Sequence, residues 1–353
     1  MQGERRSWHA VLSVIALLAL SFGNSFESLW SGTSIGMRTW SLCNIVSACT
    51  QWAMPAMVAL AGSIYLVTEK RLKAKYIWKL CIPSAIICCA IWWALSAIVW
   101  MKNNHPQDLD LITFRECLSE VLEAPASIGF CQMLVSFFIL FPLLHTIAQN
   151  QKATQYGIIL IFAMSLLESI FRYIPYLSAV ALFTDQLNWG YYRAWTFYLL
   201  CGVWVTKYEP GWKISLLIYI LGIVSTGALI AFTSSATVFA PGYANDYIGY
   251  RSPFTGIQTL SICLFVRRLF GESHFPNLTR ITKNLWHCAP ILFVVSIFTE
   301  RLMEYIVTSN LENALYSALL NIIATFCIIL AFGKLPGFRV LVGDYSHKGG
   351  ITI

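Results

Sequence analysis

Long apolar runs dominate this 353-residue chain and limit what it can fold into. A transmembrane helix needs ~20 mainly apolar residues, because the hydrocarbon core of a bilayer is ~30 Å thick and a helix rises ~1.5 Å per residue. Ten runs meet this requirement, at residues 8–26, 43–67, 76–101, 127–147, 156–176, 189–206, 214–232, 253–270, 285–303 and 311–332. The sequence therefore predicts an all-α membrane protein in which residues 1–353 form a single ten-span domain.

The composition argues against a soluble protein. Hydrophobic residues make up 57% of the chain and charged residues only 12%, whereas a soluble domain is about one quarter charged. The net charge of +7 does not indicate nucleic-acid binding, because the basic residues lie in short loops between apolar runs. Most of the 11 cysteines lie inside those runs without metal-binding spacing, so we expect no metal site. Membrane lipid is the first partner that the composition implies.

The positions of lysine and arginine predict the orientation. With the N-terminus in the cytoplasm, most of the 24 basic residues fall in cytoplasmic loops, and most of the 17 acidic residues fall on the outer side. This is the positive-inside pattern of membrane proteins. Nine or eleven spans would reverse it for the later loops. We therefore predict a multi-pass protein of the inner (plasma) membrane with both termini in the cytoplasm.

The longest outer segment, residues 102–126, is polar and acidic. Apolar residues recur in it at helical spacing, namely Leu111, Phe114, Leu118, Val121 and Leu122. This spacing predicts a short amphipathic helix that lies on the outer surface or over a cavity.

Charged residues inside apolar runs are costly in a bilayer and usually face a protein interior or a wet cavity. Glu168 and Arg172 lie four residues apart in the fifth run and therefore share one helix face. Glu300 lies near the outer end of the ninth run, Arg193 opens the sixth, and Arg251 lies in an outer loop. One interpretation is an outward-facing cavity with catalytic carboxylates and substrate-binding arginines. The other is a structural Glu168–Arg172 ion pair, with the remaining residues at the membrane interface.

The densest basic stretch, residues 69–79 (EKRLKAKYIWK), follows the second run on the predicted cytoplasmic side. Its basic residues are Lys70, Arg71, Lys73, Lys75 and Lys79. Such a stretch orients the chain and contacts lipid headgroups. It could also hold the phosphates of a donor such as coenzyme A, and charge alone does not separate these roles.

Several short motifs follow one another in a defined order along the chain. They are MP at 54–55 and LAG at 60–62 in the second run, KLCIP at 79–83 opening the third, FPLL at 141–144 closing the fourth, and FYLLCG at 197–202 in the sixth. Together with the ten runs, this order resembles the acyltransferase-3 family of bacterial inner-membrane proteins over nearly the whole chain. The resemblance implies a ten-helix fold that moves acyl groups, often acetyl from acetyl-coenzyme A, onto cell-surface sugars.

The signature of that family is an Arg and a His in the first span with ten residues between them, and often a Trp sixteen positions before the His. Trp8 stands sixteen positions before Asn24, so Asn24 occupies the position of the His and Ser13 that of the Arg. An amide can orient a hydroxyl or donate to an oxyanion, but it lacks the basicity of imidazole. A carboxylate, from Glu168 or Glu300, is then the candidate general base.

The resemblance therefore implies an O-acyltransferase, while the replacements at positions 13 and 24 leave open whether the chain is an enzyme. If active, it would use acetyl-coenzyme A or another acyl-coenzyme A from the cytoplasm and acylate a cell-surface or exported polysaccharide or glycolipid. The alternative is a catalytically inactive relative. Such a protein would transport or flip a lipid-linked or polymeric sugar, or act as a partner of other polysaccharide-assembly proteins.

Overall fold

The fold is known from a computed structural model. It describes residues 4–67, 90, 93–94, 96–98, 100–101, 104, 111–123, 140, 142–173, 189–208, 210–239, 249–271 and 311–332. The helices in this part are α1 (Glu4–Ser31), α2 (Arg38–Thr50), α3 (Ala53–Tyr65), α5 (Leu111–Glu123), α7 (Gln151–Tyr173), α9 (Trp189–Lys207), α10 (Trp212–Phe239), α11 (Pro253–Phe270) and α14 (Leu311–Phe332). The described part of the chain contains no strand, which agrees with the all-α prediction.

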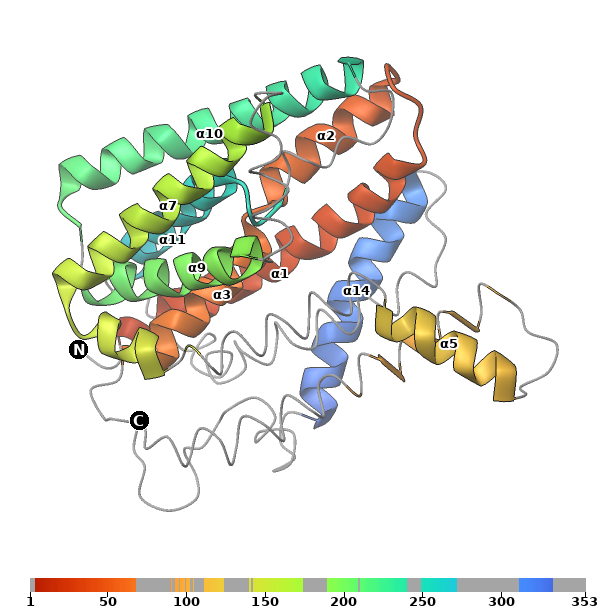
Figure 1. Cartoon of the computed structure of the whole chain (residues 1–353), viewed down its shortest axis with the longest axis horizontal. Helices are drawn as coiled ribbons and strands as arrows, with labels where there is room; N and C mark the ends of the chain where they lie inside the picture. Colours follow the sequence, from red (N-terminus) through yellow and green to blue (C-terminus); the bar gives the residue numbers. More distant parts are fainter. Residues whose placement is uncertain are drawn as a thin grey trace.

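The helices form a bundle around α1, α3, α9 and α11 (Figure 1). The pairs α10–α11, α1–α2 and α7–α9 pack on one another around this centre, and α14 crosses α1. α14 runs antiparallel to α1, because Ala314 packs near Phe26 and Trp30 while Asn321 bonds to Ser21. α5 lies outside this group of helices (Figure 1).

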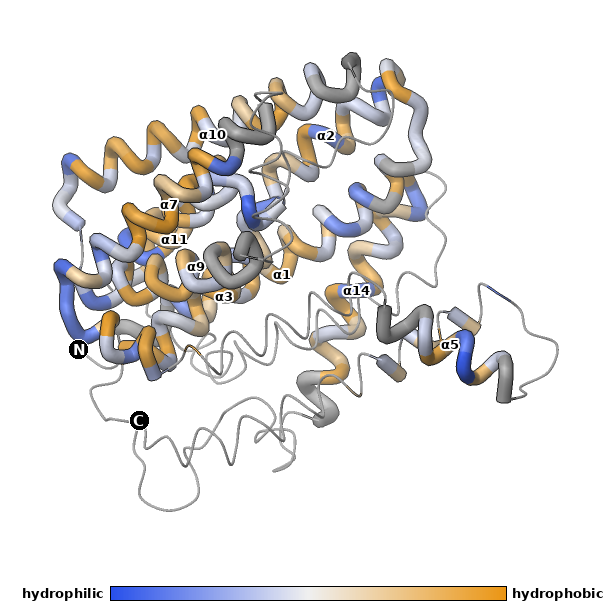
Figure 2. Tube along the Cα trace, viewed as in Figure 1, coloured by the Kyte–Doolittle hydropathy of each residue, from blue (hydrophilic) through white to orange (hydrophobic). Residues whose placement is uncertain are grey.

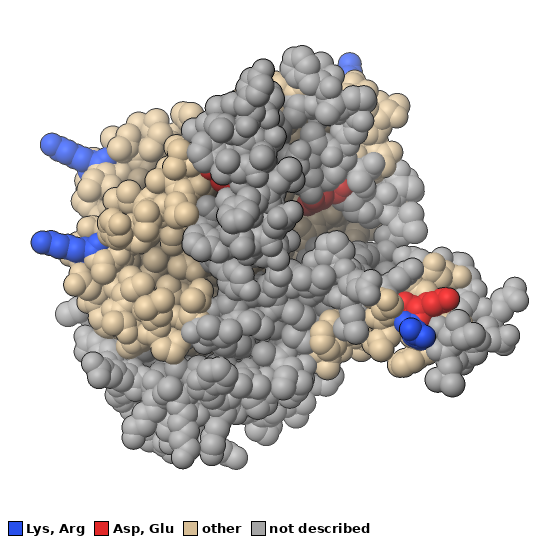
Figure 3. Space-filling model, in the orientation of Figure 1, with Lys and Arg blue, Asp and Glu red and all other residues tan. Residues whose placement is uncertain are grey.

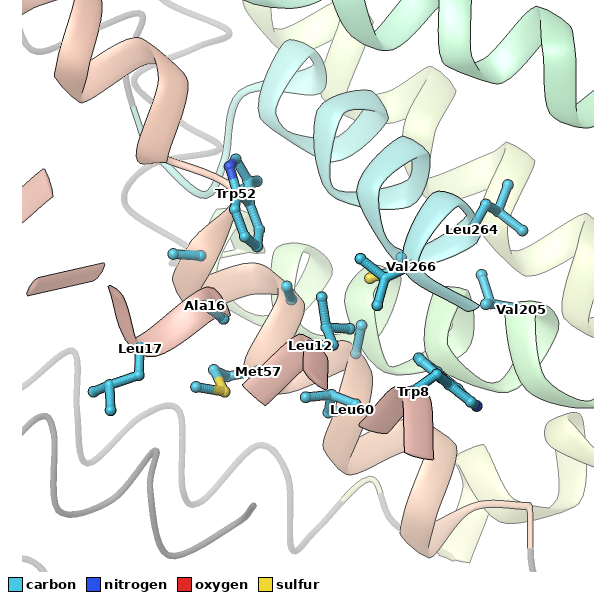
Figure 4. Close-up of a cluster of buried hydrophobic side chains, with 14 of the residues drawn as sticks. Trp8, Leu12, Ala16, Leu17, Trp52, Met57, Leu60, Val205, Leu264 and Val266 are labelled. Carbon is cyan, nitrogen blue, oxygen red and sulfur yellow. The ribbon is translucent and has the colours of Figure 1, made fainter. Parts of the chain in front are cut away.

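The largest buried apolar cluster joins the four central helices (Figure 4). α1 contributes Trp8 and Leu12, α3 contributes Leu60, α9 contributes Val205 and α11 contributes Val266. Lipid tails are as apolar as these side chains, so close packing, and not transfer out of water, holds helices together in a bilayer. The bundle therefore depends on how closely its helices can approach.

Two glycines bring α3 and α9 into backbone contact. A Cβ atom on Gly62 of α3 would overlap the backbone of Leu199, and a Cβ on Gly202 of α9 would overlap that of Ala59. Small residues at helix crossings are typical of membrane proteins. The crossing thus joins the 60–62 and 197–202 motifs, which lie far apart in the sequence.

Four helical segments of the described part are long and apolar enough to cross a membrane. They are Trp8–Glu27, Arg38–Tyr65, Trp212–Ser235 and Leu311–Ile328. α10 lies at the edge of the bundle and is mostly apolar (Figure 2), and several of its large apolar side chains are exposed, as expected where lipid is the solvent. Ile223 is 75% exposed and Val224 is 59% exposed. These helices indicate a membrane protein.

Apart from the second run, the expected runs are helical wherever the structure describes them. α11 and α14 coincide with runs 253–270 and 311–332, and α1 contains run 8–26. The second run differs, because its helix begins at Arg38 and is interrupted at Gln51 and Trp52. Runs 76–101, 127–147 and 285–303 lie wholly or mostly outside the described residues.

The predicted helix within 102–126 is confirmed as α5. Phe114 is 61% exposed and Leu118 is 45% exposed, whereas Cys117 is buried. Open apolar side chains on an amphipathic helix suit a membrane surface.

Basic side chains gather at one end of the described bundle. α7 and α10 begin there, and Figure 3 shows Lys or Arg side chains projecting from it. Lys152 and Lys213 lie at the start of these helices, while Lys207, Arg267 and Arg268 lie in the last turns of α9 and α11. We refer to this end as the basic end. His9, near the start of α1, belongs to the same half.

Candidate functional site

One face of α1 carries most of its buried polar side chains. His9, Ser13, Ser21 and Ser25 are all buried, and Asn24 is half-buried. Ser13 and Asn24 are eleven residues apart, which is about three helical turns, so they lie on the same side of α1. Polar groups in a bilayer need partners inside the protein. The neighbours of this face therefore define the candidate site.

The hydroxyl of Ser13 makes its hydrogen bond inside its own helix. Its side chain is fully buried, and its hydroxyl donates to the carbonyl oxygen of Ala10 at 2.8 Å. A serine hydroxyl bonded in this way carries no charge and is not directed at a ligand. Ser13 thus occupies the expected position without supplying the positive charge that the resemblance places there.

Asn24 lies where α1 meets the end of α2. A Cβ atom on the preceding residue, Gly23, would lie 2.5 Å from the hydroxyl oxygen of Thr50, the last residue of α2. Asn321 of α14 donates to the hydroxyl of Ser21 at 3.2 Å on the same stretch of α1. The carboxamide of Asn24 makes no hydrogen bond within the described part of the chain. It remains available to bind a polar group.

Next to this contact, the second span is broken between α2 and α3. Pro55 lacks an N–H and cannot continue the ladder of backbone bonds. Side chains bond two of the carbonyl oxygens beside the break. The indole of Trp52 donates to the oxygen of Cys49 at 2.7 Å, and Gln258 of α11 donates to the oxygen of Ala48 at 2.9 Å. An irregular backbone at this depth is tolerated only where protein groups satisfy it.

The amides of Gln258 and Asn44 connect α2, α10 and α11. Gln258 also donates to the hydroxyl of Thr226 at 2.9 Å, and Asn44 donates to Ser234 at 2.9 Å and to the oxygen of Ile230 at 3.2 Å. Both hydroxyls give their own protons to backbone carbonyls, so they accept from the amides. This fixes the NH₂ side of each amide. The two amide oxygens are buried without a hydrogen-bond partner among the described residues.

The strongest candidate for chemistry is a histidine–serine pair at the basic end. His9 Nε2 of α1 lies 2.9 Å from Ser63 Oγ of α3, and both side chains are 4% exposed. Trp8 stacks on the imidazole with ring centroids 4.0 Å apart. An imidazole within hydrogen-bond distance of a hydroxyl is the arrangement that activates a serine nucleophile.

Neither member of this pair stands out in the sequence. Fifty-four residues separate them, and neither belongs to a motif with a fixed spacing. The available signal was indirect, since Ser63 directly follows the 60–62 motif and His9 directly follows Trp8. Only the packing of α1 against α3 brings them together.

The other predicted site residues lie apart from this pair. Glu168 is half-buried in α7, which packs against α9 and α11, and Arg251 is half-buried just before α11. Arg172 and Arg193 lie in α7 and α9, and their side chains are not described. Glu300 and the basic residues Lys70, Arg71, Lys73, Lys75 and Lys79 are outside the described residues. In the part of the chain that the structure describes, no group of His, Cys, Asp and Glu could hold a metal ion.

Comparison of this chain with models of protein families, with curated proteins and with solved structures found no match.

Proposed function

We propose that the protein is a ten-span O-acyltransferase of the inner membrane with both termini in the cytoplasm. It would take an acyl group, most simply acetyl, from acyl-coenzyme A on the cytoplasmic side. The acceptor would be a hydroxyl of a cell-surface or exported polysaccharide or glycolipid. The observation that carries this proposal is the buried imidazole of His9, held 2.9 Å from a hydroxyl.

The imidazole of His9 supplies the basicity that the amide of Asn24 lacks. Acyl transfer to a hydroxyl needs a group of near-neutral pKa to accept a proton, and imidazole is the usual one. In this proposal His9 is the general base and Ser13 has only a packing role. Asn24 lies fifteen residues, or ~22 Å, further along α1, so it would bind the acceptor away from the reacting hydroxyl. A carboxylate base from Glu168 or Glu300 is the competing assignment.

The remaining predicted residues receive roles by position. The basic residues 70, 71, 73, 75 and 79 would bind the phosphates of the donor. They begin seven residues after Ser63, and an extended chain of that length reaches at most ~25 Å. Arg172, Arg193 and Arg251 would bind the acceptor at the outer side.

The test is release of coenzyme A from acetyl-coenzyme A by the purified full-length protein, with and without a candidate glycan. Removing a general base lowers such a rate by about 10²–10⁴-fold. We expect that loss in His9→Ala, whereas His145→Ala, at a half-buried histidine that contacts Gln149 and not Ser63, serves as the control. Wild-type rates in His9→Ala together with a loss in Glu168→Gln or Glu300→Gln would assign the base to a carboxylate. Glycan acylation gained only in Asn24→His would identify an inactive scaffold.

A second candidate function is passage of a lipid-linked or polymeric sugar through the bundle. The observation in its favour is the polar interface of α2, α10 and α11, where two buried amide oxygens lack partners among the described residues. Amide oxygens accept hydrogen bonds from sugar hydroxyls. Movement of a labelled glycolipid across proteoliposomes without coenzyme A release would favour this function over acyl transfer.

A further inference from the structure

The His9–Ser63 pair lies close to the basic end of the bundle. His9 is the sixth residue of α1, and Ser63 is the third residue from the end of α3. His9 is thus about one and a half turns, and Ser63 about half a turn, from a helix end. A donor that binds at the basic end would therefore approach the pair from this end.

The backbone around Ser63 is held rigidly. Gly62 packs directly on the backbone of Leu199, which leaves α3 no freedom to shift against α9. The Ser63 hydroxyl also donates to the carbonyl oxygen of Leu60 at 2.7 Å. Because that bond uses the hydroxyl proton, His9 Nε2 donates to Ser63 Oγ in this arrangement. Rotation about the Cβ–Oγ bond would turn the hydroxyl proton towards an unprotonated Nε2.

We propose that Ser63 is the nucleophile of a two-step acyl transfer and carries the acyl group as an ester, an inference that rests on the acyltransferase function above. In the first step, Ser63 Oγ bonds to the thioester carbonyl carbon and the carbon–sulfur bond breaks. The hydroxyl proton passes to His9 Nε2 and then to the leaving thiolate, which departs as coenzyme A. In the second step, an acceptor hydroxyl attacks the ester, and its proton returns through His9 to Ser63 Oγ.

The covalent step explains how one helix bundle could serve two substrates. Coenzyme A is large and highly charged, so it stays on the side of the membrane where it binds. An acyl ester on Ser63 is small and uncharged, and it can remain in the bundle after coenzyme A leaves. A purely structural His–Ser bond would instead hold α1 against α3 and take part in no chemistry.

The first step needs no acceptor, so it can be measured alone. The full-length protein in nanodiscs is mixed with radiolabelled acetyl-coenzyme A or butyryl-coenzyme A, quenched in acid and digested for mass spectrometry. We expect up to one label per chain on the peptide that contains Ser63, with a matching burst of coenzyme A. Ser63→Ala should lose both, and His9→Asn, which keeps a hydrogen-bonding side chain, should slow the burst by about 10²–10⁴-fold.

Two further variants separate chemistry from misfolding. Ser215 of α10 is also a buried serine that donates to backbone carbonyls, so Ser215→Ala is the matched control and should label normally. Ser63→Cys should carry the label as a thioester that neutral hydroxylamine removes, a result that a structural role would not produce.

The outcomes distinguish this inference from the acyltransferase proposal. Glycan-dependent release of coenzyme A that persists in Ser63→Ala, without label on wild-type Ser63, would overturn the covalent route and leave acyl transfer standing. No label and no coenzyme A release from folded wild type, with either donor and with glycan present, would overturn both.

Discussion

The interface of α3 with α9 and the interface of α2 with α10 and α11 solve the problem of helix association in opposite ways. At the first, Gly62 and Gly202 allow the two backbones to touch. At the second, amide and hydroxyl side chains hold the helices together through Asn44 and Gln258. Among the described residues, the second interface leaves two buried amide oxygens without a hydrogen-bond partner, whereas α9 leaves two buried donors, the indole nitrogens of Trp195 and Trp204.

The difference indicates that the two interfaces have different roles. Backbone contact leaves no room for a side chain and places Ser63 in one position relative to α9. Burying a polar side chain in a bilayer costs free energy unless the side chain is hydrogen-bonded. The two unbonded amide oxygens therefore mark where water or a sugar hydroxyl would enter. The first interface therefore fixes backbone positions, and the second leaves buried oxygen atoms that can accept hydrogen bonds from water or a sugar. Four substitutions test this comparison.

The largest effect is expected from Gly202→Ala. The new Cβ would overlap the carbonyl oxygen of Ala59, which is backbone and cannot rotate away. Forcing extra carbon into a packed contact costs typically 1–3 kcal/mol, and more where backbone must move. Unfolding in mixed detergent should show a loss of at least about 3 kcal/mol.

The matched control for that substitution is Gly227→Ala on α10. Gly227 has nothing within 4 Å of its would-be Cβ, so alanine should leave the unfolding free energy unchanged or raise it by up to about 1 kcal/mol. Equal shifts in the two variants would mean that the glycine crossing is not a close contact.

At the polar interface, Gln258→Met should have a smaller cost. The substitution keeps the side-chain volume but removes the donor to the oxygen of Ala48 and to Thr226. A buried acceptor left without a donor costs about 1–3 kcal/mol, and removal of the unpaired amide oxygen offsets part of this. We expect a loss of about 1 kcal/mol in the same unfolding measurement. A cost as large as that of Gly202→Ala would erase the contrast between the interfaces.

Tyr208→Phe tests a contact at the basic end of α9. The phenol donates to the oxygen of Ala148 at 2.8 Å, a bond of about 1 kcal/mol. Burial raises the pKa of Tyr208 above its usual value of about 10, while a hydrogen bond with Thr154 lowers it in part. The raised pKa favours the neutral phenol, so its contribution is fully present below about pH 10 and is lost as pH rises through the raised pKa.

The free energy of unfolding, measured as a function of pH on the alkaline side, checks this assignment. Wild type and Tyr208→Phe should be compared between neutral pH and about pH 11. We expect the gap between them to be largest at neutral pH and to narrow above pH 10. A gap that widens with pH would show that Tyr208 prefers the charged form in the folded protein.

The smallest effect is expected from Thr255→Val, which removes a buried hydroxyl of nearly the same shape. This hydroxyl has no partner among the described residues, so its loss should leave stability within about 0.5 kcal/mol of wild type or raise it. A loss above about 1 kcal/mol would show that water or another donor bonds it. That result would sharpen the comparison, because it would show that water reaches a buried oxygen of α11.

Much of the helical framework could be read from the sequence. The bounds of α11 and α14 agree with their apolar runs, and α5 agrees with the spacing of its apolar residues. These features are local, since hydrophobicity and period are properties of consecutive residues. The break at Gln51 and Trp52 was missed, although Pro55 was visible, because a proline shows where a ladder is weakened but not which side chains will bond the freed carbonyls.

The candidate site could be predicted only in part. Ser13 and Asn24 of the first span drew attention only through a resemblance, and the hydroxyl of Ser13 is hydrogen-bonded within its own helix. His9 and Ser63 were not linked, because no local pattern reports a contact between residues 54 positions apart.

The sequence by itself determined a helical chain with segments long and apolar enough for a bilayer, because a membrane imposes length and hydropathy on each segment separately. The tertiary structure alone decided which polar side chains meet. That choice depends on how closely two helices approach, and here it is set by glycines such as Gly62 and Gly202, whose missing side chains let one backbone rest on another.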